Sequence, residues 1–448
     1  MGNNSFFKNT VLKIALPITM QSLFQASFSV IDQIMTGQLG TVSIAAIGLG
    51  GKFSSLFLVV GAAIATVAGI LIAQYVGSKD EEGVSRSFFV NLFVIGIVAS
   101  FFTIISLIFP REIMSIYSKD NLTINKSAEY IKIISVGFIP MAFSLIISTL
   151  LRCKEKVKLP LYASVAAVIS NTLLNYLLIF GVGPFPKLGV IGAALATTLS
   201  RIIELVLLLI FLITMIRRKI LSLKFIIRAD NNYKKMFWSI LTPIIISEFL
   251  WSLGENIYAI IYGRIGTKSC AAMALTNPIQ SLMIGALTGI SSAAGIVIGK
   301  KLGEKNYDDA YNFSKKFMWY GLIGSIMLSI IILCTSRYYT KIYNVEGDVR
   351  NITINILIAY AIIAPVKVEN MILGNGIIRS GGKTKYLLMT DSIGTWCFGI
   401  PLGLITAFVF KMPIYQVYFI LSLEECVRLI LGCIIFKKKI WINNISLS

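Results

Sequence analysis

Residues 37–46 read GQLGTVSIAA, and residues 263–272 read GRIGTKSCAA. The two stretches share both glycines, a threonine, a serine and a pair of alanines, and they lie 226 residues apart. The same offset joins Pro17 to Pro243 and Ala68–Ile70 to Ala294–Ile296. One constant offset over about 60 residues of each half indicates an internal duplication, so we expect two lobes of similar fold.

The composition is that of a membrane protein. Hydrophobic residues make up 56% of the 448 residues and charged residues 14%, against about 45–50% and about 25% in soluble domains. Crossing a hydrocarbon core takes about 20 helical residues. Apolar runs of that length lie at roughly 12–37, 44–73, 84–108, 128–151, 158–181, 188–214, 236–263, 270–299, 308–334, 351–378, 384–408 and 413–436. The predicted fold is therefore all-α and polytopic, with twelve transmembrane helices in two six-helix repeats.

The repeats divide the chain into an N-terminal lobe at 1–215, a linker at 216–235 and a C-terminal lobe at 236–448. Six helices bring each half back to the side on which it began. The repeats are therefore parallel, related by an axis along the membrane normal. We expect a substrate path between the lobes.

Lys and Arg give the chain a net charge of +20, and they gather in the N-terminal segment, in alternate loops and in the tail. Short loops rich in these residues stay in the cytoplasm. The pattern predicts a multi-pass protein of the cell (inner) membrane with both termini and the linker cytoplasmic. We expect it to be a monomer. It also explains the charge through the lipid bilayer, without a nucleic-acid partner.

Several kinds of chemistry lack their usual residues. The chain has no histidine, and its six cysteines are scattered without a Cys-x-x-Cys pair. The sequence GGKT at 381–384 resembles the end of a phosphate-binding loop, but Ile377 stands where that motif needs glycine. We therefore predict that the protein is not an enzyme and has no cofactor.

Charged residues inside the apolar runs carry the information, since each costs about 2.5–3.5 kcal/mol near the bilayer centre. Glu204 lies three residues after Arg201, while Glu424 and Glu425 lie four and three before Arg428. This spacing puts opposite charges on one helix face. Mutual neutralisation is the interpretation we favour.

Asp32 has no Lys or Arg within a helical turn, so its carboxylate needs a proton or a cation. Asn171 and Asn175 share a face of the helix predicted at 158–181, and Thr197 and Thr198 lie in the next. Together they offer the oxygen ligands that a hard cation prefers, so Asp32 and Asn175 are candidate ligands for Na+. Alternatively, the amides and hydroxyls bond helix to helix.

A second acidic face lies in the run at 236–263. Glu248 and Glu255 are seven residues apart, with Trp251 and Tyr258 nearby. With Phe28 from the first run, these aromatic rings suit a cationic substrate through cation–π contacts. The alternative is that the aromatic residues pack or face lipid.

Lys367, Glu369 and Asp391 form a third charged group. An unpaired Lys367 is costly at that depth, so we predict an ion pair with Asp391 or Glu369. The group is either a fixed strut or a network that protonation or substrate rearranges.

Two stretches resemble the multidrug and toxic compound extrusion (MATE) transporters. VIDQIMTG at 30–37 with AAIG at 45–48 resembles their first helix, and RSGG at 379–382 with Trp396 and PLG at 401–403 resembles their helix 10–11 junction. The resemblance implies efflux of organic, often cationic and aromatic, compounds in exchange for Na+ or H+. It also implies a cation-coupling role for the four polar residues Asp32, Asn171, Asn175 and Thr197. Some members carry aspartate where Asn175 stands, which leaves the coupling ion open.

The sequence thus favours a secondary antiporter that works by alternating access. A lipid-linked oligosaccharide flippase is one alternative, although its cavity would be lined by arginines rather than carboxylates. A membrane-embedded enzyme is another, and the only dense polar cluster it could use lies between residues 351 and 436.

Overall fold

The computed structural model describes residues 2–219, 221, 223–224, 230–341, 343 and 345–444. Every regular element in these residues is a helix, and none is a strand. The chain groups into two compact units. The first unit is Met20–Lys234, and the second unit is Lys235–Ser448 together with Met1–Thr19.

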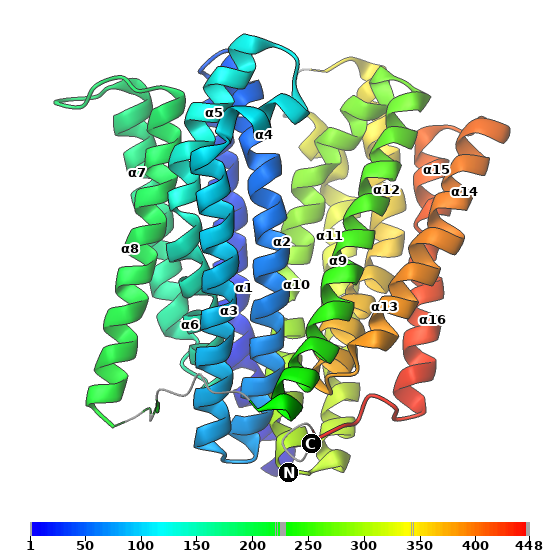
Figure 1. Cartoon of the computed structure of the whole chain (residues 1–448). Helices are drawn as coiled ribbons and strands as arrows, with labels where there is room; N and C mark the ends of the chain where they lie inside the picture. Colours follow the sequence, from blue (N-terminus) through cyan, green and yellow to red (C-terminus); the bar gives the residue numbers. More distant parts are fainter. Residues whose placement is uncertain are drawn as a thin grey trace. The chain divides into compact units, whose positions relative to one another are not determined.

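The first unit is built of long helices that run side by side (Figure 1). Its elements are most of α1 (Gly2–Gly37), α2 (Thr41–Gly77), α3 (Glu81–Ile108), α4 (Pro110–Tyr117), α5 (Asn121–Val136), α6 (Phe138–Cys153), α7 (Lys158–Phe180) and α8 (Val190–Arg217).

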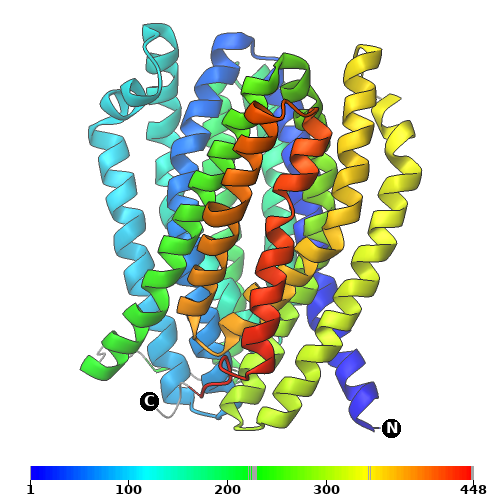
Figure 2. The ribbon, with the colours of Figure 1, turned by 90° about the vertical axis from the view of Figure 1, so that its right-hand side faces the viewer.

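The second unit has the same kind of bundle but more interruptions. Its elements are α9 (Asn231–Ile265), α10 (Thr267–Gly303), α11 (Tyr307–Lys341), α12 (Gly347–Asn370), η1 (Met371–Ile378), α13 (Thr384–Ser392), η2 (Ile393–Gly399), α14 (Ile400–Leu404), η3 (Ile405–Val409), α15 (Ile414–Leu421) and α16 (Glu424–Lys437). The elements labelled η are π-helical, a form that often marks functional sites. In Figure 2, α16 (red) stands beside the orange helices α13 and α14.

The start of α1 groups with the second unit. The Thr19 hydroxyl donates a hydrogen bond to the Ala286 carbonyl of α10 at 3.1 Å. A Cβ at Gly289 of α10 would lie 2.3 Å from the Ala15 carbonyl oxygen. The glycine therefore allows the two backbones to pack closely. The lobe predicted at 1–215 includes these residues, whereas in the structure they group with the second half.

The duplication is visible in the helix boundaries. α2 and α10 both span 37 residues and begin 226 residues apart. Each follows a glycine with positive φ, Gly40 at 83° and Gly266 at 151°. Glycine adopts such φ values without the strain that a Cβ would bring, which explains why both halves keep it.

Ten helices are long and apolar enough to cross a membrane among the described residues, and the pair α5 and α6 makes an eleventh if its 40° bend at Gly137 lies within one span. The run predicted at 413–436 is instead divided into α15 and α16 at Ser422 and Leu423. Glu424, Glu425 and Arg428 also lower its hydropathy. The count of twelve is therefore not confirmed in full.

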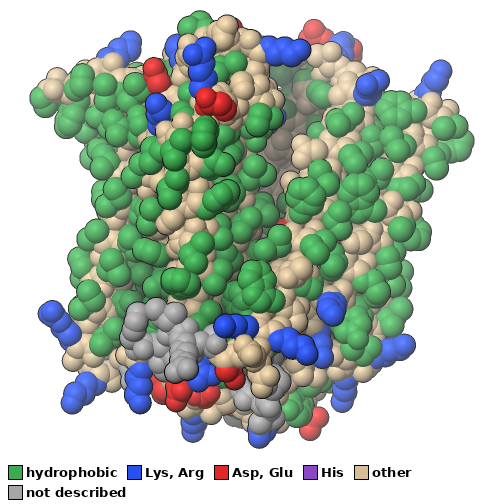
Figure 3. Space-filling model, viewed as in Figure 1, with side chains coloured by type: hydrophobic (Ala, Val, Ile, Leu, Met, Phe, Trp, Pro, Cys, Tyr) green, Lys and Arg blue, Asp and Glu red, His purple; other side chains and the backbone are tan. Residues whose placement is uncertain are grey.

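Hydrophobic side chains cover the sides of the helices, whereas Lys, Arg, Asp and Glu gather at the helix ends (Figure 3). Phe101 of α3 is 60% exposed and Trp319 of α11 is 62% exposed. Large apolar side chains exposed in this pattern match a lipid environment and not water.

Candidate functional site

Four polar side chains meet in the first unit, from α1, α7 and α8. The Asn175 amide donates to the Asp32 carboxylate at 2.6 Å and to Asn171 Oδ1 at 3.2 Å. The Asn171 amide donates to Thr197 Oγ1 at 3.4 Å. The structure thus brings together all four residues that the sequence predicted as the cation-coupling site.

Close packing of α7 on α8 positions this cluster. A Cβ at Gly192 would lie 2.6 Å from the Leu178 carbonyl oxygen, so only glycine permits the approach of the two helices there. The neighbouring Thr198 is buried, and its hydroxyl donates to the Ile133 carbonyl at 3.0 Å. Thr198 therefore fits the helix-to-helix alternative, whereas Thr197 belongs to the cluster.

The cluster has oxygen atoms to offer a hard cation. Asn175 is 0% exposed, and its Oδ1 has no hydrogen-bond partner within the described residues. Rotation of this amide would exchange its donor for its acceptor beside the Asp32 carboxylate. Na+ favours such oxygen ligands, so the donor set fits. Among the described residues, no group of three His, Cys, Asp or Glu side chains converges as a metal site.

The second unit contains a cavity of about 660 Å³. Glu248, Trp251, Glu255 and Tyr258 of α9 all line it. Their spacing of three, seven and ten residues from Glu248 puts them on one helix face. The structure thus places four of the five residues predicted to contact substrate on one wall, while the Phe28 side chain lies outside the described part of the chain. Their role in binding stays a prediction.

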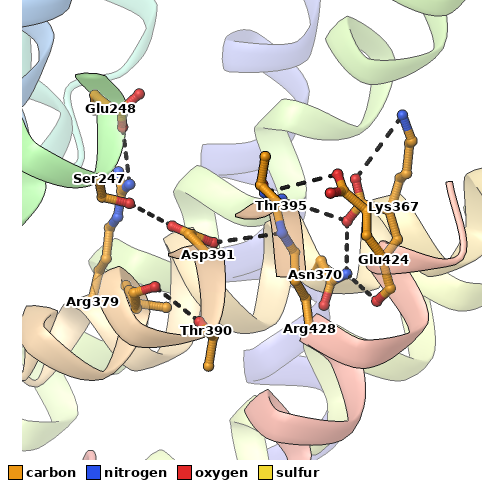
Figure 4. A network of polar contacts seen from close by, with 12 residues as sticks. Ser247, Glu248, Lys367, Asn370, Arg379, Thr390, Asp391, Thr395, Glu424 and Arg428 are labelled. Atoms are coloured by element: carbon orange, nitrogen blue, oxygen red, sulfur yellow. Dashed lines mark hydrogen bonds and ion pairs between the residues drawn. The ribbon is translucent and has the colours of Figure 1, made fainter. Parts of the chain in front are cut away.

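One ion pair and one hydrogen bond join two sides of this cavity (Figure 4). Arg379, which follows η1, lies with its Nη2 3.0 Å from Glu248 Oε1 on α9. The Ser247 hydroxyl donates to Asp391 of α13 at 2.5 Å. The sequence singles out Arg379 only within a motif. Its pairing with Glu248 follows from the fold, since 131 residues separate the partners.

Arg428 of α16 is the centre of a second set of contacts (Figure 4). It donates to the Thr395 hydroxyl at 2.6 Å and lies 3.7 Å from Glu425 and 4.0 Å from Glu424. The predicted pairing of Arg428 with both glutamates is confirmed. In the first unit the predicted pair of Arg201 and Glu204 is confirmed as well, at 3.0 Å.

The predicted partners of Lys367 are wrong. Its Nζ lies 4.0 Å from Glu425 Oε1, whereas Asp391 lies 4.0 Å from Arg428 Nε. Glu369 is buried, and its Oε1 has no hydrogen-bond partner within the described residues. Residues two apart point to nearly opposite sides of a helix, so Lys367 lines the cavity while Glu369 faces α11, beside Gly321.

Asn370 at the end of α12 also contacts α16. Its amide donates to the Glu425 carbonyl at 2.7 Å and to the Glu425 carboxylate at 2.9 Å. These bonds fall where the chain passes from α15 to α16. Asn370 thereby links α12 to the break between α15 and α16, where residues of the chain line the cavity.

The MatE family profile matches this chain twice, at residues 17–177 and 243–405. The chain belongs to the MatE family. The two MatE matches begin 226 residues apart, which confirms the duplication. Members of this family are MATE transporters, so the chain is a multi-pass membrane protein and its relatives are not enzymes.

Similar MatE proteins match over most of their length. The chain is 24% identical over 459 residues to the "Uncharacterized transporter YisQ" of Bacillus subtilis (strain 168), covering 98% of each. It is 25% identical over 407 residues to the "Probable multidrug resistance protein NorM" of Bacillus cereus (strain ATCC 14579), covering 87% and 86%.

A solved structure shows the same fold. The outward-facing conformation of a multidrug resistance MATE family transporter of the MOP superfamily matches with a TM-score of 0.88 and 18% identity, covering 97% and 96% of the two chains. The fold of the chain is therefore that of MATE transporters.

Proposed function

We propose that this protein is a secondary antiporter that exports organic cations in exchange for Na+ or H+. Relatives named as probable multidrug resistance proteins support a role in drug resistance, which export of organic compounds would provide. The observation that carries the proposal is the environment of the Asp32 carboxylate. This carboxylate accepts a hydrogen bond from the Asn175 amide but has no ion pair among the described residues.

An unpaired carboxylate in a transmembrane helix is costly when charged. Binding of H+ or Na+ at Asp32 removes that cost and changes the polarity of the contact between α1 and α7. Conformations that differ at this contact then bind the cation with different affinity, which is the condition for coupling an ion gradient to alternating access. The unpartnered Oδ1 of Asn175 supports a Na+ ligand role, while H+ needs Asp32 alone.

In this proposal the organic cation binds in the cavity of the second unit. Five carboxylates line it against three basic side chains, and the aromatic rings of Trp251 and Tyr258 stand among them. An acidic, partly aromatic surface attracts a desolvated organic cation by charge and by cation–π contact. The acidic excess disfavours a flippase for anionic lipid-linked sugars.

The proposal also covers placement in the cell. The gathering of Lys and Arg in alternate loops supports cytoplasmic N- and C-termini in the inner membrane. We propose that one chain suffices for transport, because both polar sites are built from residues of a single chain.

Transport in proteoliposomes tests the function. The purified protein is reconstituted, a Na+ or H+ gradient is imposed, and uptake of radiolabelled tetraethylammonium is measured against protein-free liposomes. One of the two gradients should drive accumulation against the concentration of the cation. If neither gradient drives accumulation, or if accumulation occurs only with added ATP, the proposal is overturned.

A further inference from the structure

The cavity of the second unit contains a cation of its own. Three basic side chains line it, Lys367, Arg379 and Arg428. The two arginines are fixed by hydrogen bonds, Arg379 to Glu248 at 3.0 Å and Arg428 to Thr395 at 2.6 Å. Lys367 donates no hydrogen bond within the described residues, and its nearest carboxylate oxygen is 4.0 Å away on Glu425.

The surroundings of Lys367 are those that an organic ammonium group prefers. Its Nζ lies 4.0 Å from Glu425 and 5.9 Å from the centre of the Tyr418 ring. Charge on one side and an aromatic face on the other is the usual way in which proteins hold alkylammonium ligands. The side chain is 25% exposed, so a ligand in the cavity can reach it.

Glu255 completes this arrangement. It lines the same cavity, is exposed, and has neither a hydrogen bond nor an ion pair among the described residues. Lys367 thus lines a cavity that also holds Glu255 and Glu425, and of these two carboxylates only Glu425 comes within 4.0 Å of its ammonium group.

We propose that Lys367 is a tethered competitor of the substrate, which occupies the place of the substrate's cationic group and yields it when the substrate enters. The lysine ammonium is a point charge on a flexible four-carbon chain, held here without directional bonds, so it can swing away at small cost. The inference rests on the proposed function, in which this cavity takes organic cations. In this proposal Lys367 determines whether the cavity accepts substrates with one positive charge or with two.

Electrostatics gives the expected selectivity. One cationic group of a dication can displace the Lys367 ammonium, but the displaced ammonium stays tethered to the cavity wall and repels the other group. Two like charges several ångströms apart repel each other appreciably at the effective dielectric of a protein surface. The cavity therefore accepts monocations and rejects dications, although five carboxylates line it.

Equilibrium dialysis with a matched pair of probes tests this. Hexyltrimethylammonium carries one quaternary charge, and hexamethonium carries two on a chain of the same length. Lys367→Met, in the full chain in nanodiscs, should tighten hexamethonium binding about tenfold and hexyltrimethylammonium binding much less. Lys367→Arg keeps the charge, so it should retain the wild-type preference for the monocation.

Each other outcome is informative. If Lys367→Met weakens both probes or leaves their ratio unchanged, Lys367 is a strut and the inference fails alone. If neither probe binds to the wild type or to any variant, the cavity is not a cation site and the proposed function fails with it. Thermal unfolding of each variant identifies loss of fold, in which case Lys367→Gln, which keeps hydrogen-bonding capacity, replaces Lys367→Met.

Discussion

The two halves keep the same helices but place their acids differently. Under the 226-residue offset, Tyr258 stands where Asp32 stands, and Glu424 stands where Thr198 stands. In the first unit the carboxylate is on α1 and accepts a hydrogen bond from α7. In the second unit the Tyr258 hydroxyl on α9 donates to the Glu424 carboxylate on α16. The first helix of each half thus makes a polar contact with a later helix, α7 in the first unit and α16 in the second. The carboxylate lies on the first helix in one unit and on the later helix in the other.

The backbone differs as well. α7 and α8 of the first unit are continuous over 23 and 28 residues. The equivalent part of the second unit alternates between α-helical and π-helical turns from α13 to η3, and it is broken again between α15 and α16. Continuous helices in the first unit hold a compact cluster of four polar side chains. Interrupted helices in the second unit surround a cavity of about 660 Å³.

The largest expected effect separates the two equivalent residues, Asp32 and Tyr258. Asp32→Asn removes the only ionisable group of the first cluster, so gradient-driven uptake of tetraethylammonium should fall to the level of protein-free liposomes. Tyr258→Phe removes one hydrogen bond to the Glu424 carboxylate, which Arg428 still neutralises, so uptake should persist. Uptake by Asp32→Asn at the wild-type rate would remove Asp32 from coupling.

The second effect concerns binding in the cavity. Glu255→Gln removes a carboxylate that has no cationic partner within 4.0 Å among the described residues, so tetraethylammonium affinity should weaken about tenfold. Isothermal titration in nanodiscs measures it. Glu112→Gln, which removes an exposed carboxylate of the first unit, is the matched control and should bind as the wild type does. Equal affinities for all three proteins would exclude Glu255 from the site.

The third effect tests how the second unit makes room for the Tyr258 contact with Glu424. A Cβ at Gly399 would lie 2.1 Å from both the Tyr258 hydroxyl and a Glu424 oxygen. Gly399→Ala should therefore lower the free energy of unfolding by about 1–3 kcal/mol. Leu173, its equivalent in the first unit, is 56% exposed, and Leu173→Ala should have little effect in thermal unfolding. An unchanged Gly399→Ala variant would show that the contact is dispensable.

The smallest effect lies at two equivalent helix starts. Asp120, the N-cap of α5, accepts hydrogen bonds from the Thr123 hydroxyl and amide, which lower its pKa below the ordinary value. Glu346 stands at the equivalent N-cap of α12 but makes no capping bond. The lowered pKa means that this stabilisation is present above the ordinary aspartate pKa and is lost as the pH falls through the lowered value.

Thermal unfolding as a function of pH checks this difference. Asp120→Ala should lower the melting temperature at neutral pH, and the loss relative to the wild type should shrink on acidification below about pH 4. Glu346→Ala should change the melting temperature less at neutral pH. A larger effect of Glu346→Ala would mean that its 3.0 Å ion pair with Lys268 matters more than the cap.

The site of the first unit was predictable from sequence because it needs only helical spacing. Asn171 and Asn175 are four apart on a continuous helix and so share one face. Asp32 lacks a partner on its own helix, so this asparagine face could be predicted to lie against it. The apolar runs likewise predicted most spans to within a few residues, since length and hydropathy decide them.

The contacts of the second unit could not be obtained in this way. π-helical turns change the number of residues per turn, so the direction in which Arg379 or Asp391 points does not follow from regular spacing. The break at Ser422 also shifts Glu425 relative to α15 and brings it close to Lys367. Lys367 therefore pairs with Glu425 and not with Asp391 or Glu369, the partners that the sequence suggested. Periodicity carries no information on such breaks.

The central claim is that ion coupling resides in the first unit and organic-cation binding in the second. Exchange of radiolabelled tetraethylammonium across the liposome membrane without any ion gradient tests it most directly, because exchange needs binding but no coupling. Asp32→Asn should retain exchange while losing gradient-driven uptake, whereas Glu255→Gln should lose both in proportion. Loss of exchange in Asp32→Asn together with full exchange in Glu255→Gln would contradict the account.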